Sequence, residues 1–196
     1  MDSIRIFGYK SFKKLSVQLH PINLLIGANG AGKSNFLSLF EMLGNIYEKR
    51  LGAYVAQVGG VDKLLYQGRK VTDRIAVNLL IAKSEYDLAL LESDGKLIVE
   101  REVVGCYDDV CPLDLVRKNV ITEFQSESSL KDHKEEDLSN YISQIRKFHF
   151  HDTGRRSPFT ADSHIVNDAY RMYEHGENLA AILYRIQREK PMAYRR

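Results

Sequence analysis

The feature that most constrains this chain is a glycine-rich turn between two apolar segments. Residues Gly27–Ser34 read Gly-Ala-Asn-Gly-Ala-Gly-Lys-Ser, and the residues before them, Ile22–Ile26, are mostly apolar. Such a run is typical of a strand that is buried on both faces, as in a parallel sheet. The spacing after the turn predicts a helix that begins near Lys33 and ends before Gly52. The apolar residues at helical spacing are Phe36, Leu39, Phe40, Leu43 and Tyr47.

The turn matches the G-x-x-x-x-G-K-S pattern of a phosphate-binding loop, or P-loop. Glycines let the backbone curl so that successive N–H groups point at phosphate oxygens, and the following helix adds its positive end. In this pattern Lys33 reaches the β- and γ-phosphates, and the Ser34 hydroxyl binds Mg²⁺. We therefore expect ATP and Mg²⁺ as cofactors, with Lys33 as the catalytic residue and Ser34 as the metal ligand. The residues expected to bind the cofactor are Asn29, Gly30, Ala31, Gly32, Lys33, Ser34 and Asn35.

Outside the turn, the first two thirds of the chain have the pattern of an antiparallel sheet. Ile4–Ile6 and Leu15–Leu19 alternate like strands, and residues 53–70 are expected to be loop with short elements. Three further strand-like runs follow, with a tight-turn signal at Ser93–Gly95. These runs are Arg74–Ile81, Tyr86–Leu91 and Leu97–Val104. The expected fold class is α/β, a P-loop core sheet joined to an antiparallel β meander with flanking helices.

Helical spacing returns in the last third of the chain. Leu138–Ile145 and Leu179–Ile186 predict helices, with Asn178 as the N-cap of the second, and Phe148–His151 is a candidate short strand. Pro191 is well placed to open another helix that the chain does not continue, so we expect a piece of a longer protein. The expected organisation of 1–196 is a P-loop region (1–52), an antiparallel β region (53–124) and a truncated helical region (125–196).

The composition is that of a soluble globular chain. Hydrophobic residues make up 44% and charged residues 28% of the sequence, and the net charge of +2 neither requires nor excludes a nucleic-acid partner. No apolar run is long enough to cross a bilayer, and the N-terminus lacks a signal peptide, so we expect a cytoplasmic location and no membrane. Cys106 and Cys111 lack zinc-site spacing and are expected to be reduced thiols.

The segment around the turn resembles the start of RecF/SMC-type ABC ATPases. Those proteins begin with a strand, an aromatic-basic-Ser-Phe stretch and a P-loop that ends in Lys-Ser-Asn. The counterparts here are Ile4–Ile6, Gly8–Lys13 and Gly27–Asn35. Farther on, Phe148–Thr153 and Asn178–Arg185 look like segments of a bacterial group of RecF-like proteins that are often described as AAA-family ATPases. The resemblance covers most of the chain and is specific at the P-loop.

The resemblance implies an ATPase that holds ATP between the P-loop of one subunit and a signature motif of its partner. It therefore implies a homodimer formed through an ATP sandwich, and work on DNA in repair, chromosome maintenance or defence against phage. A basic residue ahead of the P-loop can contact nucleotide phosphate in this family, and Lys13 is the candidate here, beside Lys10 and Lys14. The candidates for the glutamine that senses Mg²⁺ are Gln57, Gln67, Gln125 and Gln144.

Two motifs that the resemblance requires are not recognisable. Leu138-Ser139-Asn140 is the nearest match to the signature but lacks its glycine. The apolar runs Asp87–Glu92 and Leu97–Glu100 end in an acid, as a Walker B strand does, but both fall in the expected meander, where an antiparallel edge element is the wrong place for a metal-binding acid. We expect ATP binding by this chain, and hydrolysis only when a missing lobe supplies both motifs.

Two other functions stay open. A non-catalytic nucleotide-binding subunit would take the Walker B acid and the signature from a partner chain. A small P-loop kinase would have this size, although no basic lid follows the P-loop, and a GTPase would carry an Asn-Lys-x-Asp motif that is absent.

Weaker candidate sites lie in the second half of the chain. His149 and His151 would share one face of a strand, with Asp152 adjacent, so a metal site is conceivable beside the simpler role of packing. Clusters of basic residues could contact a DNA backbone or simply be solvated. These clusters are Lys49-Arg50, Arg155-Arg156 and Arg185–Arg196.

Overall fold

The computed structural model describes residues 1–107, 115–133, 136–148, 150 and 169–194. The chain divides into two compact units, Met1–Ile145 and Arg146–Arg196. Each unit is described by itself.

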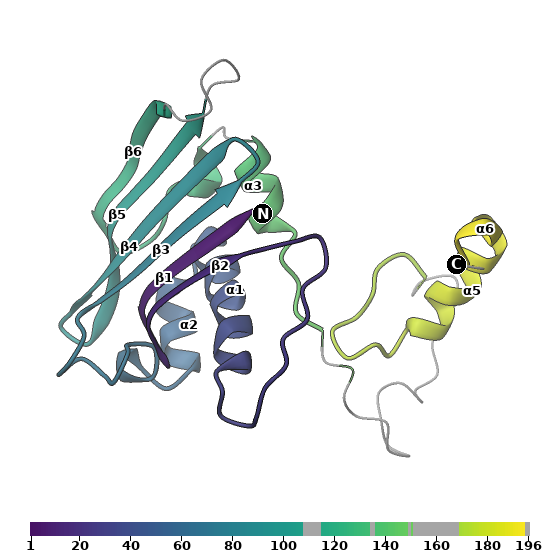
Figure 1. The fold of residues 1–196 in the computed structure, drawn as a ribbon, viewed down its shortest axis with the longest axis horizontal. Helices are drawn as coiled ribbons and strands as arrows, with labels where there is room; N and C mark the ends of the chain where they lie inside the picture. The colour runs from purple at the N-terminus through teal and green to yellow at the C-terminus, as the bar shows by residue number, and fades with distance from the viewer. Residues whose placement is uncertain (108–114, 134–135, 149, 151–168, 195–196) are drawn as a thin grey trace. The chain divides into compact units, whose positions relative to one another are not determined.

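The first unit is built on one six-stranded sheet, and every pair of neighbouring strands in it is antiparallel. The strand order is β2-β1-β3-β4-β5-β6, so β2 and β6 form the two edges of the sheet (Figure 1). The strands are β1 (Ser3–Tyr9), β2 (Phe12–Gln18), β3 (Arg74–Ile81), β4 (Ser84–Ser93), β5 (Lys96–Tyr107) and β6 (Leu115–Gln125). The structure thus confirms the predicted antiparallel meander.

The sheet has one apolar face because its strands alternate. On β3, Ile75, Val77 and Leu79 are buried, while the residues between them are not fully buried. Val77 pairs with Ile6 of β1 and with Leu88 of β4, both of which are also buried, so apolar residues line up across the sheet. A sheet that is solvated on one face needs a cover on the other.

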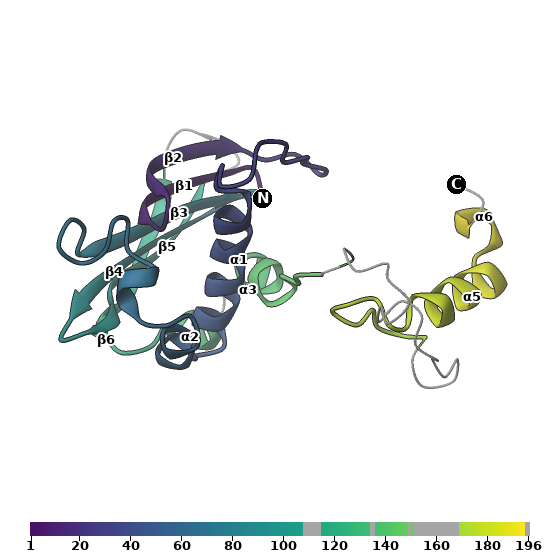
Figure 2. The ribbon, with the colours of Figure 1, turned by 90° about the horizontal axis from the view of Figure 1, so that it is seen from below.

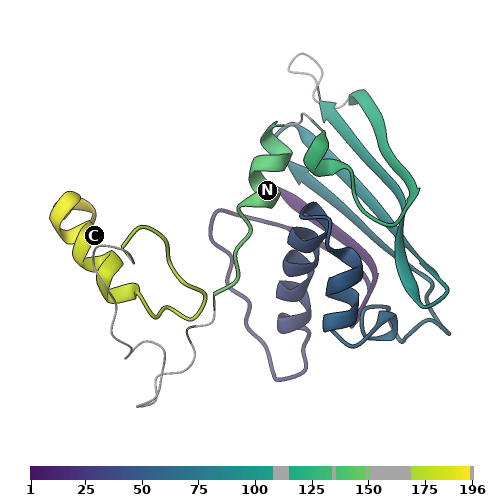
Figure 3. The same ribbon diagram turned by 180° about the vertical axis from the view of Figure 1, so that it is seen from behind.

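Helices supply that cover. Figures 2 and 3 show α1 (Lys33–Tyr47) and α2 (Leu51–Gln57) on the same face of the sheet, with α3 (Glu136–Ser143) beside α1. Two short 3₁₀ helices, η1 (Val61–Lys63) and η2 (Leu130–Asp132), complete the unit. The side chains that α1 buries recur every three or four residues, as an amphipathic helix requires. They include Phe36, Leu39, Met42, Leu43 and Ile46.

The strand predicted before the glycine turn is wrong for the described structure. Residues 22–26 form no strand, and the side chains of Ile22, Leu24 and Ile26 are 90%, 81% and 84% exposed. Figure 1 shows the segment between β2 and α1 as a wide loop. A strand buried on both faces needs neighbouring strands to satisfy its backbone, and no described strand pairs with this one. The expected parallel core sheet is therefore absent from the described residues.

Two elements were not predicted. Helix α2 forms despite Gly52 because Leu51, Tyr54 and Val55 pack into the core, and packing outweighs weak helix propensity. The edge strand β6 pairs with β5 through two register shifts, which break the alternation that identifies a strand in sequence.

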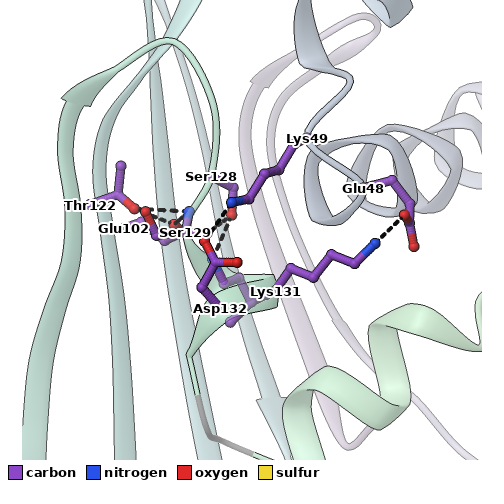
Figure 4. Close-up of polar contacts among 9 residues, drawn as sticks. Glu48, Lys49, Glu102, Thr122, Ser128, Ser129, Lys131 and Asp132 are labelled. Atoms are coloured by element: carbon purple, nitrogen blue, oxygen red, sulfur yellow. Dashed lines mark hydrogen bonds and ion pairs between the residues drawn. The ribbon is translucent and has the colours of Figure 1, made fainter.

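A polar strap, residues 127–132, connects the β5–β6 edge of the sheet to the corner between α1 and α2 (Figure 4). Its anchor is the fully buried carboxylate of Glu102 on β5, which accepts hydrogen bonds from Ser128 Oγ at 2.6 Å and from the Ser129 backbone N–H at 3.0 Å. Tyr86 and Thr122 also donate to it, at 2.5 Å and 2.7 Å. These four donors satisfy the carboxylate without a cation.

The second unit contains α5 (Leu179–Glu189) and α6 (Pro191–Tyr194), which confirm the last two predicted helices. Asn178 occupies the N-cap position, but its buried side chain bonds the backbone of Tyr173 and Arg171 and makes no cap hydrogen bond to the helix. Phe148 and Phe150 are not in a strand. His149, His151, Asp152 and the Arg155-Arg156 cluster lie outside the described residues.

Candidate phosphate-binding loop

The glycine turn leads directly into α1, as its sequence pattern predicts. Gly30 and Gly32 have φ angles of 82° and 94°, in the left-handed region that glycine adopts without strain. Helix α1 begins at Lys33, has no acidic residue in its first turn and has no side-chain cap. The backbone N–H groups at this end are therefore not engaged by a capping side chain, and they form the kind of positive helix terminus that binds phosphate.

The ammonium group of Lys33 is turned back onto the loop. Its Nζ donates to the carbonyl oxygens of Gly27 at 2.6 Å and Ala28 at 2.7 Å. Ser34 is exposed at the start of the helix, and Asn29 and Ala31 are exposed in the turn. Lys33 would exchange these two carbonyl contacts for phosphate oxygens when a triphosphate enters, because a charge-assisted bond to an anion is stronger than one to a neutral carbonyl.

The turn between β1 and β2 packs against the loop. A Cβ atom on Gly32 would lie 3.0 Å from Ser11 Oγ and 3.1 Å from Phe12 Cζ, so a larger residue would crowd the hairpin in addition to adopting a strained positive φ. Asn35 Nδ2 donates to Ser11 Oγ at 2.9 Å. Asn35 therefore fastens the helix start to the hairpin, and the aromatic-basic-Ser-Phe stretch lies against the P-loop.

Of the three lysines ahead of the P-loop, the structure joins Lys10 to α1. Lys10 Nζ donates to Ser38 Oγ at 2.8 Å. Lys13 and Lys14, in contrast, are exposed on β2. The prediction that Lys13 contacts the nucleotide stays untested, and Lys10 is the lysine held next to the helix that carries Lys33.

Buried hydroxyl groups, which no sequence pattern indicated, hold the first turns of α1. Tyr9 Oη and Ser38 Oγ share a hydrogen bond of 2.9 Å, and Tyr54 Oη donates to the Ser38 carbonyl at 3.3 Å. Burial raises the pKa of Tyr9 far above its ordinary value. The neutral phenols of Tyr9 and Tyr54 therefore anchor α1 one turn beyond Ser34.

One of the four candidate glutamines lies near the loop. Gln67 lines a cavity of about 770 Å³ together with Lys10 and Asn35. Gln57 ends α2, Gln125 ends β6 and Gln144 follows α3. Among these four residues, Gln67 is the one that shares a pocket with Asn35, the residue directly after Ser34.

The acid-terminated runs have structural roles within the sheet. Glu92 accepts a hydrogen bond from the Gly95 N–H at 2.8 Å, which closes the β4–β5 turn, and Glu100 forms an ion pair of 2.8 Å with Arg74. Both runs lie on interior strands of the sheet and not at its edge, which corrects the expected position. The signature-like Leu138–Asn140 lies in α3, where Leu138 is part of the core.

Comparison with known proteins agrees with this geometry. The sequence model of a family described as AAA ATPase domain matches residues 1–177. The chain belongs to the AAA ATPase domain family. The match confirms the resemblance to AAA-family ATPases that the glycine turn and its flanking segments indicated. No curated protein matches the chain.

Membership of the AAA ATPase domain family supports ATP binding and hydrolysis in general and points to a P-loop NTPase, while the described fold itself is an antiparallel sheet covered by helices. Such domains use Mg²⁺ with the nucleotide, and the exposed hydroxyl of Ser34 beside Lys33 is a donor of the kind that this ion takes. In the described part of the AAA ATPase domain, no helix is both long and apolar enough to cross a bilayer.

Proposed function

We propose that this chain is the nucleotide-binding part of an ABC-type ATPase of the RecF/SMC kind, with Mg-ATP held at Gly27–Ser34. The observation that carries the proposal is the left-handed glycine turn that opens into an uncapped helix at Lys33. A protein catalyses phosphoryl transfer mainly by positioning the reactants and by neutralising the charge on the phosphates. Lys33 and Ser34 would supply part of both here. Asn29–Gly32 would provide the backbone donors.

Hydrolysis requires a second lobe that supplies a Walker B acid and a signature motif. The exposed apolar run of residues 22–26 supports this, because an apolar segment of strand length beside the P-loop is suited to pair with strands of such a lobe. The candidate acids Glu92 and Glu100 are already used by the sheet. The completed protein would dimerise through an ATP sandwich and act on DNA, in repair, maintenance or anti-phage defence.

A non-catalytic nucleotide-binding subunit is the second candidate. It is favoured because the two candidate acids among the described residues are already engaged: Glu92 closes the β4–β5 turn and Glu100 pairs with Arg74. Neither is then free to serve as a Walker B acid. Both functions predict nucleotide binding by the chain itself. They differ in whether turnover appears when the second lobe is supplied, whereas fast phosphoryl transfer by the isolated chain would instead indicate a small kinase.

The test is a calorimetric titration of the chain with Mg-ATP, beside the variants Lys33→Ala and Lys83→Ala. Lys33→Ala removes the cation that faces the β- and γ-phosphates and is expected to weaken binding at least about tenfold, which is about 1.4 kcal/mol. Lys83, in the turn after β3, is the matched control and should leave binding unchanged. Absence of heat for the unsubstituted chain, or equal affinities for both variants, would refute the proposal.

A further inference from the structure

A depression of about 470 Å³ lies on the face of the sheet that points away from the helices of the first unit. Figures 2 and 3 show α1, α2 and α3 on one face of the sheet, and no described α-helix of this unit lies on the other. Arg5 and Phe7 belong to the uncovered face, because each is exposed and follows a buried isoleucine along β1. None of the P-loop residues Gly27–Ser34 lines this depression.

The shape of the depression comes from one row of residues that crosses the strands. Phe7 of β1 lies opposite Ala76 of β3, and Ala76 lies opposite Ala89 of β4. Phe7 is 45% exposed, whereas each alanine offers only a methyl group. A protruding aromatic ring therefore stands beside a hollow with a floor of small side chains, and such a surface can interlock with another that has the same features.

The neighbouring row carries opposite charges on its two sides. Arg5 of β1 lies opposite Asn78 of β3, which lies opposite Asp87 of β4. Arg5 is exposed and has no hydrogen-bond or ion-pair partner within the described residues. The carboxylate of Asp87 accepts a hydrogen bond of 2.6 Å from the neutral amide of Asn78. Because two strand spacings, or about 10 Å, separate β1 from β4, Arg5 and Asp87 stand apart within one chain.

We propose that this face of the sheet binds the same face of a second copy of the chain, around a two-fold axis that runs along β3. The two rows extend over β2, β1, β3, β4 and β5, so β3 is their middle strand, and a rotation of 180° about it exchanges β1 with β4. The rotation brings Phe7 of one copy over Ala89 of the other, and Arg5 of one copy over Asp87 of the other. Symmetry makes each contact twice.

The arrangement of ring, hollow and charges favours a second copy over a different partner. A site for a charged ligand would present one sign of charge, whereas here the aromatic ring and the cation each lie two strands from their complement. At the rim, Lys14 of one copy meets the ion pair of Arg101 with Glu123 of the other, whose net charge is zero. The inference does not rest on the proposed function, because the contact uses neither nucleotide nor the P-loop.

The test is sedimentation equilibrium without nucleotide, at up to about 200 μM protein, because a contact of this size is expected to have a dissociation constant of about 10–100 μM. Arg5→Asp and Asp87→Arg each place like charges opposite each other and should weaken dimerisation at least about tenfold. The double variant Arg5→Asp/Asp87→Arg restores opposite charges and should dimerise within about threefold of the unsubstituted chain. Lys96→Asp, an exposed position at the start of β5, is the control for charge reversal and should change little.

The interlocking shape has its own variant. Ala89→Phe fills the hollow that receives Phe7 and should weaken dimerisation, and circular dichroism verifies that each variant is folded. Residues 22–26 are the same in every variant, so self-association through that run cannot account for a difference between them.

Three results would overturn the inference. They are a chain that stays monomeric throughout this concentration range, equal shifts for Arg5→Asp and Lys96→Asp, and a double variant that dimerises no better than the single ones. Lys33→Ala should dimerise like the unsubstituted chain, and Arg5→Asp should retain Mg-ATP binding. A failure of the P-loop proposal is thereby distinguished from a failure of this one.

Discussion

At the scale of single residues, the P-loop depends on glycines for two different reasons. Gly30 has positive φ but open space where a Cβ would lie, whereas Gly32 has positive φ and is also pressed against Ser11 and Phe12. The pattern G-x-x-x-x-G-K-S requires glycine at position 32 but not at position 30. The hairpin contact explains the requirement sterically, and it is a tertiary contact that the motif alone does not reveal.

Gly32→Ala is therefore expected to cost more than Gly30→Ala. Left-handed backbone costs a side chain about 1–2 kcal/mol, which both variants incur, and only Gly32→Ala adds a clash with the hairpin. Urea unfolding should show a larger loss of stability for Gly32→Ala, by about 1 kcal/mol or more, and calorimetry should show weaker Mg-ATP binding. Equal losses for the two variants would mean that the hairpin does not press on the loop.

The phenol of Tyr86 leads to a prediction about pH. Burial, followed by the charge of Glu102, raises the pKa of Tyr86 well above its ordinary value near 10. Above pH about 10 the unfolded chain releases this proton and the folded chain keeps it, so stability falls as pH rises, by up to about 1.4 kcal/mol per pH unit for this group. Below about pH 10 this group does not affect how the free energy of unfolding changes with pH.

Tyr86→Phe should flatten the alkaline decline in the free energy of unfolding, measured by urea titration between about pH 8 and 11. It should also lower stability near pH 7 by about 1.5–3 kcal/mol, because Glu102 loses a donor that is 2.5 Å away. Buried Tyr9 leaves a residual slope in the variant. An unchanged slope would show that Tyr86 ionises in the folded protein as it does in the unfolded chain.

At the scale of elements, the polar strap of residues 127–132 fixes where α1 ends and α2 begins. Glu127 accepts the backbone N–H groups of Leu51 at 3.0 Å and Gly52 at 3.4 Å, so a carboxylate caps the positive end of α2. Ion pairs of Lys49 with Asp132 and of Glu48 with Lys131 surround this cap. Glu102 holds the strap to β5, next to the edge strand β6, and the strap thus connects that side of the sheet to the chain between α1 and α2 (Figure 4).

Glu127→Ala is expected to destabilise the first unit by about 1 kcal/mol, because two N–H groups of α2 lose their acceptor. Asp132→Asn is the matched comparison in the same strap. It breaks an ion pair between half-exposed and exposed side chains, and such a pair contributes less than about 1 kcal/mol. Denaturant unfolding measures both, and a larger loss for Asp132→Asn would contradict the assignment of Glu127 as the cap.

At the scale of the whole molecule, the apolar run of residues 22–26 stands out because its side chains are exposed to solvent. Soluble proteins rarely expose large contiguous aliphatic patches, and such patches commonly mark a surface that contacts a protein partner, a membrane or a ligand. The sheet of the first unit cannot absorb this run, because β2 already forms its edge and turns away into the loop. No described strand pairs with the run, and the second lobe that we propose would supply strands for it.

Replacing Ile22, Leu24 and Ile26 together by serine should leave the stability of the first unit nearly unchanged, since these side chains make no core contacts. It should reduce binding of a hydrophobic dye and self-association, as measured by fluorescence and by analytical ultracentrifugation. Val71→Ser, at another exposed aliphatic residue, is the control and should change neither. Cooperative unfolding at lower denaturant in the triple variant would show that the run is part of the folded core.

Local sequence pattern by itself determined that α1 begins at Lys33 and that β3, β4 and β5 form a meander. It also determined the family, through the phosphate-binding turn. Both side-chain periodicity and the residues that such a turn requires are encoded within a few neighbouring positions. Only the tertiary structure decided that residues 22–26 lie outside the sheet, that Leu51–Gln57 is a helix and that Lys10, Gln67 and Lys70 line one cavity. Those outcomes depend on which distant segments are present to pair or pack, and no local pattern contains that information.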